Sequence, residues 1–331
     1  MSHSLTTQAA FPPRRVAPRF SLLGFYGSQA LGLLVLVLLI IVCPFVVYPV
    51  FLMQAMCFAL FACAFNLLIG YGGLMSLGHA AFFGMGSYVT AWTAKQLGLT
   101  PELAIVAGGV VGGLLGMVFG WISIRRQGLY FGMITLALAQ MAYFFCLQAP
   151  FTGGEDGIQQ VPRGALFGIV SLASDTTMYV FTAVVFLLFF LLIHRIIHSP
   201  FGQVLKAIRE NEPRAVSLGY RTDTYKLITF TLSSFIAGIA GGTKAIVFGI
   251  ATLTDVHFTA SGDVVLMTLL GGLGTVFGPV VGATLVKALE QYLSGYGSWV
   301  TVTQGVIFVL CVLAFRRGIV GEIAGRLRIR L

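Results

Sequence analysis

The sequence carries very little charge for its length. Only 9% of its 331 residues are Asp, Glu, Lys or Arg, against about 25% in soluble domains, and 57% are hydrophobic. A surface in water needs charged side chains to stay dissolved, and the mean hydropathy of +0.94 shows the opposite bias. This scarcity excludes a soluble globular enzyme and indicates that lipid is the main solvent of the chain.

Motifs for disulfides, metals and nucleotides are missing as well. The five cysteines lie in apolar runs without a C-x-x-C pair, so we expect them to pack as small hydrophobic residues: Cys43, Cys57, Cys63, Cys146 and Cys311. No G-x-x-x-x-G-K-[ST] sequence occurs, so the chain has no P-loop of its own. His194 and His198 have the spacing of a helical metal pair but no third ligand, and we interpret them as histidines at an interfacial helix end. We therefore predict no catalytic residue, no metal site and no cofactor, and a chain that is not an enzyme.

Long apolar runs are what the sequence has instead. A hydrocarbon core about 30 Å thick requires about 20 apolar residues per helix. Eight runs of this kind are present: 29–49, 51–69, 79–95, 102–124, 129–148, 177–197, 227–250 and 300–315. The first run passes through Cys43 and Pro44 without an A-x-A-like cleavage site, which favours a retained helix over a signal peptide. The sequence predicts an all-α polytopic membrane protein with about eight full transmembrane helices.

A further apolar stretch, 263–289, is interrupted by glycines and by Gly278-Pro279. Non-helical backbone at membrane depth persists only where it is buried in protein or lines a wet cavity, so this break should do one of the two. A plain kink at Pro279 packed against a neighbouring helix is the alternative. The stretch is expected to enter and leave by the same face or to split into two short crossings, which gives 8–10 helices in total.

Basic residues are concentrated in four segments that can face the cytoplasm together. Because Lys and Arg in short loops stay on the cytoplasmic side, both termini, Arg125 and the segment 198–226 are predicted inside, and Glu102 and Asp175 outside. The net charge of +9 comes from basic residues that mark the cytoplasmic face and its lipid headgroups. The sequence lacks the interleaved aromatic residues of a nucleic-acid-binding surface, so we predict no nucleic-acid partner. The expected organisation is a cytoplasmic tail over 1–28, a transmembrane domain over 29–315 and a basic cytoplasmic tail over 316–331.

The longest polar interval on the predicted inner face spans 199–219. Val204, Leu205 and Ile208 form the apolar face of a short amphipathic helix, a turn at Pro213 follows, and Gly219 closes a second helix. A membrane protein with little else in water is expected to use such a segment for docking to a partner. A helix lying on anionic headgroups is the alternative.

Several ordered motifs resemble one family of membrane proteins. The segment 65–84, with Gly70-Tyr71-Gly72-Gly73 and Ser76-Leu77-Gly78-His79, is similar to the permease subunits of bacterial branched-chain amino acid ABC importers. The resemblance extends over roughly 50–320 and points to the M-type subunit of that family. Its further motifs are Gly128-Leu129-Tyr130-Phe131, Thr152-Gly153-Gly154-Glu155-Asp156-Gly157, the segment 199–226, and Gly271-Gly272-Leu273-Gly274 with Gly278-Pro279.

The resemblance implies a multi-pass subunit of an importer in the bacterial inner (plasma) membrane. In this family M-type and H-type permease subunits form the channel, two cytoplasmic ATPases drive it, and a periplasmic binding protein delivers the substrate. The ATPase-docking loop of such permeases carries a Glu-Ala-Ala-x-x-x-Gly-like motif. This chain has Arg214 where an alanine is usual and Pro213 before it. The residues that the resemblance assigns to ATPase coupling are Arg209, Glu210, Glu212, Ala215 and Gly219.

The two glycine-rich breaks are predicted to line the substrate route, because unwound backbone offers carbonyls and amides to a bound solute. Polar side chains beside them would supply further contacts to a mostly apolar substrate. For His79, a hydrogen bond to loop backbone is the alternative. The predicted route residues are Asn66, Gly70, Tyr71, Gly72, Gly73, Ser76, His79, Gly271, Gly272 and Gly274.

Lys244 is added to this route because a charge within a membrane span is costly and usually functional. It is expected to attract a substrate carboxylate, to pair with Asp255 or Asp263, or to extend to the interface.

The predicted function is import of branched-chain or related amino acids, driven by separate ATPase subunits. An ion-coupled secondary transporter is the alternative, but such proteins place carboxylates near the midplane, whereas Asp and Glu here lie almost wholly in loops or at span ends. A membrane-embedded enzyme is disfavoured because a catalytic cluster is missing. The sequence leaves the substrate open among branched-chain amino acids, other amino acids, amides and urea.

Overall fold

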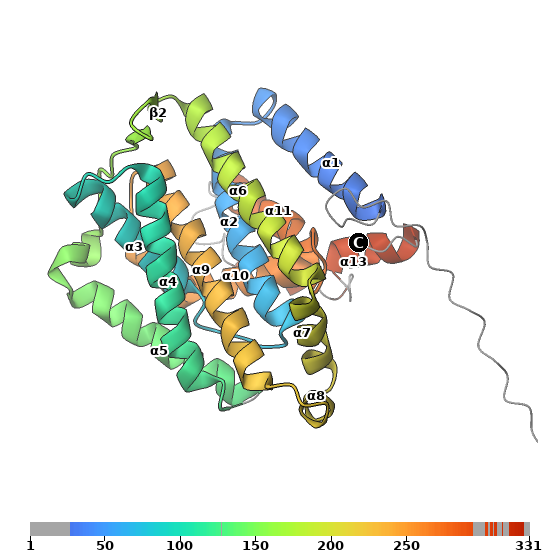
Figure 1. Ribbon diagram of the computed structural model, residues 1–331. Coiled ribbons are helices and arrows are strands. Elements are labelled where there is room, and N and C mark those ends of the chain that lie inside the picture. The colour runs from blue at the N-terminus through green and yellow to red at the C-terminus, as the bar shows by residue number, and fades with distance from the viewer. Residues whose placement is uncertain are drawn as a thin grey trace, which may run out of the picture.

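A computed structural model describes residues 27–126 and 128–293 and part of 302–327. The described residues are mostly helical (Figure 1). The α-helices are α1 (Gly27–Val42), α2 (Pro49–Asn66), α3 (Ala80–Gln96), α4 (Pro101–Ser123), α5 (Leu129–Gln148), α6 (Asp175–His198), α7 (Pro200–Glu210), α8 (Glu212–Ser217), α9 (Thr222–Phe248), α10 (Phe258–Gly271), α11 (Gly278–Leu293) and α13 (Gly318–Leu327). The shorter turns are η1 (Cys43–Phe45), η2 (Leu67–Tyr71), η3 (Pro150–Thr152), η4 (Gly154–Asp156) and η5 (Leu253–Asp255). Two short strands, β1 (Ala165–Leu166) and β2 (Val170–Ser171), pair antiparallel.

Within the described residues, five helices are long and apolar enough to cross a membrane: α2 with η2, α4, α5, α6 and α9. They correspond to five of the predicted spans, and α5 has the predicted bounds. Helix α3 covers the predicted span 79–95 with 17 residues, about 25 Å of helix, while α1 and α10 are shorter apolar helices. The structure therefore confirms an all-α polytopic membrane protein. The predicted span 300–315 lies largely outside the described residues, as does most of the tail 1–28.

One predicted boundary was wrong. The first helix ends at Val42 instead of continuing to 49, because Pro44 has no N–H to donate and the chain turns through η1. The predicted tail 316–331 contains the helix α13. Its first residue, Gly318, packs so closely on the loop after α10 that a Cβ would lie 2.3 Å from Gly272 Cα.

Helices α3, α4 and α9 pack through glycines (Figure 1). A Cβ on Gly86 of α3 would lie 2.4 Å from the carbonyl oxygen of Gly238 in α9, and a Cβ on Gly116 of α4 would lie 2.3 Å from Ser234 Cβ. Small residues let transmembrane backbones approach closely, so these three helices form one tightly packed unit. Three cysteines are buried as predicted (Cys57, Cys63 and Cys146), Cys43 is partly buried, and Cys311 lies outside the described side chains.

Helices α10 and α11 form an antiparallel hairpin. Gly271 packs on the carbonyl of Gly278, and one turn further from the tip Gly282 packs on the carbonyl of Met267. The connection 272–277 is not helical. The break is therefore a true interruption between two helices and not a plain kink at Pro279.

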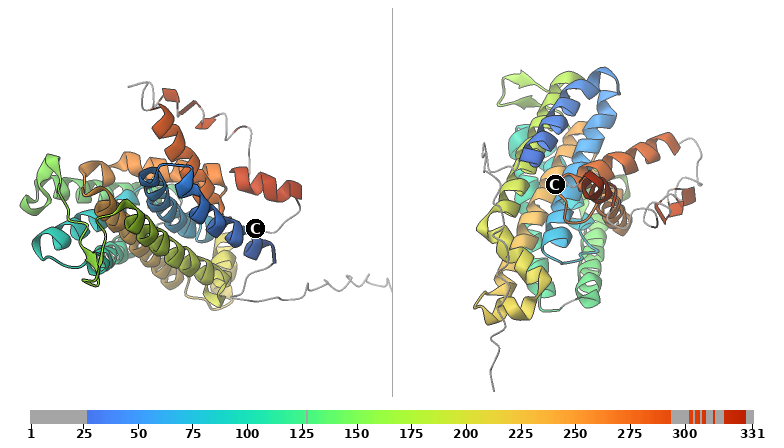
Figure 2. Two further views of the ribbon diagram at one scale, coloured as in Figure 1. Left: turned by 90° about the horizontal axis from the view of Figure 1, so that it is seen from above. Right: turned by 90° about the vertical axis from the view of Figure 1, so that its right-hand side faces the viewer.

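The two ends of the bundle differ in charge. The connection between α4 and α5, whose sequence contains Arg125 and Arg126, lies at the same end as α7 and α8, whereas β1 and β2 lie at the opposite end (Figure 1; Figure 2, right). The clustering of basic residues predicted that these segments share one side. That this side faces the cytoplasm stays a prediction.

Candidate substrate route and coupling contacts

The last turn of α2 is irregular. Residues Leu67–Tyr71 form a π-helical turn, in which the amide of Gly72 bonds the carbonyl of Leu67 at 3.3 Å. Such turns are rare and frequently lie at functional sites. The turn leaves the carbonyl of Gly70 as an acceptor for a side chain from another helix.

Asn66, directly before this turn, holds the tip of the α10–α11 hairpin. Its Nδ2 donates to the carbonyl of Thr275 at 2.9 Å, and its Oδ1 accepts from the amide of Gly274 at 3.0 Å. Gly274 has a φ of +73°, a conformation that favours glycine. A Cβ on Gly70 would lie only 2.8 Å from the Gly274 amide nitrogen, so the two predicted glycine-rich breaks meet here.

Helix α7 also contacts the π-helical turn at Gly70. Ser199 caps the helix by accepting from the amide of Gly202 at 3.3 Å, and Leu205 and Ile208 are buried, as the amphipathic pattern predicts. The next residue, Arg209, donates from Nη1 to the carbonyl oxygen of Gly70. One side chain therefore connects α7 to the π-helical turn and, through Asn66, to the hairpin tip.

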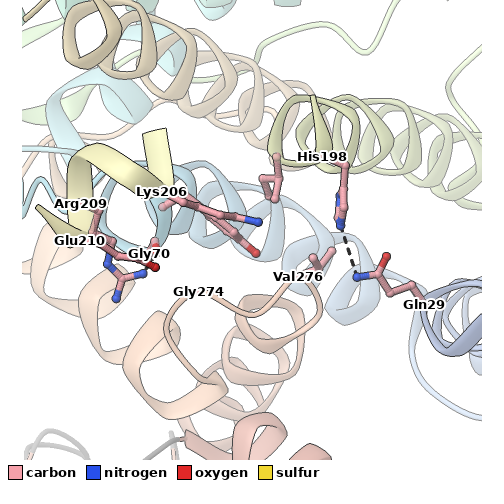
Figure 3. Close-up of a pocket in the computed structure, with 10 residues that line it drawn as sticks. Gln29, Gly70, His198, Lys206, Arg209, Glu210, Gly274 and Val276 are labelled. Atoms are coloured by element: carbon pink, nitrogen blue, oxygen red, sulfur yellow. Dashed lines mark hydrogen bonds between the residues drawn. The ribbon is translucent and has the colours of Figure 1, made fainter. Parts of the chain in front are cut away.

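A cavity of about 440 Å³ lies between these elements (Figure 3). Its wall combines α1, η2, the end of α6, α7 and the hairpin tip: Gln29, Gly70, Tyr71, Ile197, His198, Lys206, Arg209, Glu210, Gly274 and Val276. Three predicted route residues (Gly70, Tyr71 and Gly274) and two predicted coupling residues (Arg209 and Glu210) thus share one space.

The other predicted route residues do not line this cavity. Ser76 and His79 are fully buried, and His79 Nε2 lies 3.1 Å from Ser233 Oγ, which itself donates to the carbonyl of Ala64. His79 is therefore bonded to a side chain of α9 and not to loop backbone. The remaining glycines make close contacts: Gly72 with the Leu68 carbonyl, Gly73 with Arg209, Gly271 with Gly278 and Gly272 with Gly318.

Lys244 lies in the second half of α9 and forms a buried ion pair with Asp255 of η5. Its Nζ lies 2.8 and 2.7 Å from the two carboxylate oxygens, and both residues are less than 10% exposed. Asp255 also accepts from the amide of Thr252 at 3.4 Å. Of the predicted alternatives the structure contains the pair with Asp255, and Lys244 does not line the cavity beside α7.

The second half of the predicted coupling segment is the short helix α8. The turn before it is at Asn211, whose Oδ1 accepts from the amide of Arg214 at 3.1 Å, so the prediction of a turn at Pro213 was wrong. Proline fits the first turn of a helix because the amide it lacks has no partner there. Gly219, with a φ of +87°, closes the helix as predicted, and the amide of Tyr220 bonds the buried Ala215.

Glu212 at the start of α8 forms an ion pair with Lys226 at the base of α9. This contact fixes α8 to the α3–α4–α9 unit. Glu210 and Arg214, in contrast, are exposed.

Sequence reasoning did not select several residues that matter for this geometry. Gln29 of α1 lies 3.4 Å from both His194 and His198, whose rings stack with centroids 4.2 Å apart. Among the described residues, no group of three or more His, Cys, Asp or Glu side chains is placed to hold a metal ion. Lys206 lies over the ring of Tyr71 at 5.4 Å, and its half-burial lowers the pKa of its ammonium group. In the sequence, Lys206 was distinguished only as a cation beside the apolar face of the predicted amphipathic helix.

Comparisons with known proteins agree on one family. The family model described as "Branched-chain amino acid transport system / permease component" matches residues 47–315. The high-affinity branched-chain amino acid transport system permease protein LivM of Salmonella typhimurium is 25% identical over 342 residues, which cover 95% of this chain and 80% of that protein, and LivM of Escherichia coli has the same values. The permease protein LivH of Salmonella typhimurium is 26% identical over 283 residues, covering 80% of this chain and 91% of LivH. No solved structure matches.

Proposed function

This chain belongs to the family of permease components of branched-chain amino acid transport systems, and we propose that it is the M-type permease of an ABC importer carrying a branched-chain or related amino acid into the cytoplasm. Its proposed partners are an H-type permease subunit, two cytoplasmic ATPase subunits and a periplasmic binding protein. Its proposed location is the bacterial inner membrane. As in its relatives, its role is transport and not catalysis.

The observation that carries this proposal is the continuous contact from α7 to both glycine-rich breaks. Arg209 bonds Gly70, and Asn66, four residues before Gly70, bonds Gly274 and Thr275. A displacement of α7 would therefore act directly on the π-helical turn and, through Asn66, on the non-helical hairpin tip. Discrete rearrangement of such contacts is how packed helices change access to a site.

Helix α8 and the residues after it supply the proposed docking surface for an ATPase. Val216 is 55% exposed, Leu218 69% and Tyr220 41%, at the end of the bundle that also carries the basic segments. Ala215 is buried and Gly219 closes the helix, so these two residues shape α8 while their neighbours face outward. Glu212 acts in this proposal as an anchor for α8 through Lys226.

The route is proposed to pass the hairpin tip. Gly70, Tyr71 and Gly274 line it directly, and Asn66 holds the tip in place. Gly72, Gly73, Gly271 and Gly272 shape the two breaks through close backbone contacts. His79 supports the packing of α2 against α9, Ser76 is fully buried, and both would reach substrate only after a rearrangement.

Reconstitution tests the proposal. The permease pair, both ATPases and the binding protein are placed in liposomes with ATP in the lumen, and uptake of radiolabelled L-leucine, L-isoleucine and L-valine is measured. We expect uptake that requires ATP and the binding protein and that stops when the ATPase is inactivated. Counterflow of the same amino acids through this chain without any ATPase subunit would instead identify an ion-coupled secondary transporter.

A further inference from the structure

Two cations in the cavity beside α7 have no carboxylate partner among the residues that the structure describes. Neither Lys206 nor Arg209 forms an ion pair with any residue that the structure describes, and Arg209 donates only to the carbonyl of Gly70. Lys206 is half-buried, with its ammonium over the ring of Tyr71. Arg209 is exposed, whereas the partial burial of the Lys206 charge without an acidic partner is unfavourable, so this wall favours a bound anionic group.

The same wall also carries one negative charge. Glu210 lies four residues after Lys206, which places the two on one face of α7, yet they form no ion pair with each other. A ligand with one positive and one negative group can satisfy both. Glu210 disfavours polyanions such as nucleotides, because like charges repel in a partly desolvated site.

The rest of the cavity combines aliphatic, polar and backbone groups. Ile197 and Val276 are aliphatic, Gln29 and His198 are polar, and Gly70 and Gly274 present main-chain groups. The volume of about 440 Å³ is in the range of small-molecule sites. In Figure 3 the side chain of Lys206 extends into this space from α7, and Val276 lies on the opposite wall.

We propose that this cavity is a binding site for a zwitterionic amino acid with an apolar side chain. Lys206 and Arg209 take the carboxylate, Glu210 takes the ammonium group, and Ile197 and Val276 contact the side chain. The inference rests on the proposed function, because the ligand is the transported amino acid arriving from the side of α7. Since Arg209 also holds Gly70, occupancy stabilises the contact between α7 and the hairpin tip. Accumulated product then slows further import.

The test uses the reconstituted complete transporter with its ATPases facing the lumen. Liposomes are loaded with L-leucine, with 3-methylbutylamine, which lacks the carboxylate, or with 4-methylpentanoate, which lacks the amine. The readout is the initial rate of ATP hydrolysis stimulated by external binding protein and substrate. We expect lumenal L-leucine to lower this rate, and each analogue to require at least about tenfold higher concentration, since each loses one or more charge-assisted contacts.

Two variants test the carboxylate and ammonium contacts separately. The ATP hydrolysis rate of each variant is normalised to its own rate without lumenal ligand. Lys206→Met should raise the half-inhibitory concentration of L-leucine about tenfold. Glu210→Gln should reduce the difference between the half-inhibitory concentrations of L-leucine and 4-methylpentanoate. Arg195→Gln is the matched control, because Arg195 is an exposed cation of α6 outside the cavity and its loss should change neither value.

The outcomes distinguish this inference from the function on which it rests. Active ATP-dependent import that is insensitive to lumenal L-leucine overturns the product site and leaves the proposed function intact. Equal inhibition by L-leucine and 4-methylpentanoate would mean that the ammonium group is not recognised, and it overturns the proposal of a zwitterion site. Absence of ATP-dependent import, with no binding of radiolabelled L-leucine to the transporter in nanodiscs lacking the binding protein, overturns both.

Discussion

The side chain of Asn66 spans the gap between α2 and Gly274 and bonds the hairpin tip with both of its polar atoms. Substitution by alanine leaves the amide of Gly274 and the carbonyl of Thr275 without this partner in a partly buried setting. We expect Asn66→Ala to destabilise the protein by about 1–3 kcal/mol per lost partner and to reduce import strongly. Thermal unfolding in detergent and uptake in proteoliposomes measure the two effects. Gln203→Ala removes an exposed amide and serves as the control; equal behaviour of the two variants would contradict the role of Asn66.

Arg209 should govern how efficiently ATP hydrolysis is converted to transport. Arg209→Met keeps the aliphatic stem but loses the donor to Gly70, so α7 can move without moving the hairpin tip. We expect import per ATP hydrolysed to fall about tenfold, with partial recovery in Arg209→Lys. Arg214→Met removes an exposed cation from α8 and is the control. The prediction fails if Arg209→Met lowers hydrolysis and import in equal proportion.

The pair of Lys244 with Asp255 should behave as a structural unit. Breaking a buried ion pair from one side costs about 3–5 kcal/mol, because the remaining charge is left without a partner. We therefore expect Lys244→Met alone to lower stability and uptake, and Lys244→Met combined with Asp255→Leu to recover most of the loss. Denaturant titration and uptake at matched membrane levels test this double-mutant cycle. A stable double variant without transport would place Lys244 on the substrate route.

The glycine contacts between α3 and α9 should tolerate no added carbon. Gly86→Ala puts a Cβ 2.4 Å from a backbone oxygen, and overpacking of this kind costs about 1–3 kcal/mol. Gly262→Ala is the matched control, because Gly262 is exposed on α10 and no atom lies within 4 Å of its Cβ position. Alanine there should be neutral or stabilise by up to about 1 kcal/mol. Unfolding temperatures of the two variants in the same detergent test this prediction, and equal values would contradict it.

The predicted orientation can be measured with single cysteines in a cysteine-free background. Phe167→Cys marks the turn between β1 and β2, and Ser217→Cys marks α8; both positions are exposed. A membrane-impermeant maleimide should label Phe167→Cys in intact cells and Ser217→Cys only after lysis. The reverse pattern would contradict both the orientation and docking of an ATPase on α8.

Hydropathy predicted most of the spans because lipid imposes one simple requirement on helix length. It placed α5 at its observed bounds and the other long helices within a few residues. It failed at Pro44, where local backbone chemistry ends α1 although the surrounding residues stay apolar. The π-helical turn after Asn66 was also not predicted, since no residue pattern in that run separates it from an ordinary helix.

The candidate site was predicted only in part because its contacts join distant segments. Both glycine-rich breaks were recognised, but their meeting depends on Asn66 and Gly274, which are 208 residues apart. The partner of Lys244 was among the predicted alternatives because Asp255 lies only 11 residues further along the chain. Lys206 and Gln29 were missed, since a single polar residue beside an apolar run has many ordinary explanations.

The close approach of Gly86 to Gly238 constrains where motion can occur. With less than a methyl group of space between these backbones, α3 and α9 cannot slide past one another without first separating. The α3–α4–α9 unit must then act as the fixed frame of the transport cycle. Distances between spin labels within that frame should stay constant through the cycle, and all change should be confined to α7 and the hairpin tip. A small molecule wedged between those two parts would arrest the transporter by occupying the cavity proposed for the transported amino acid.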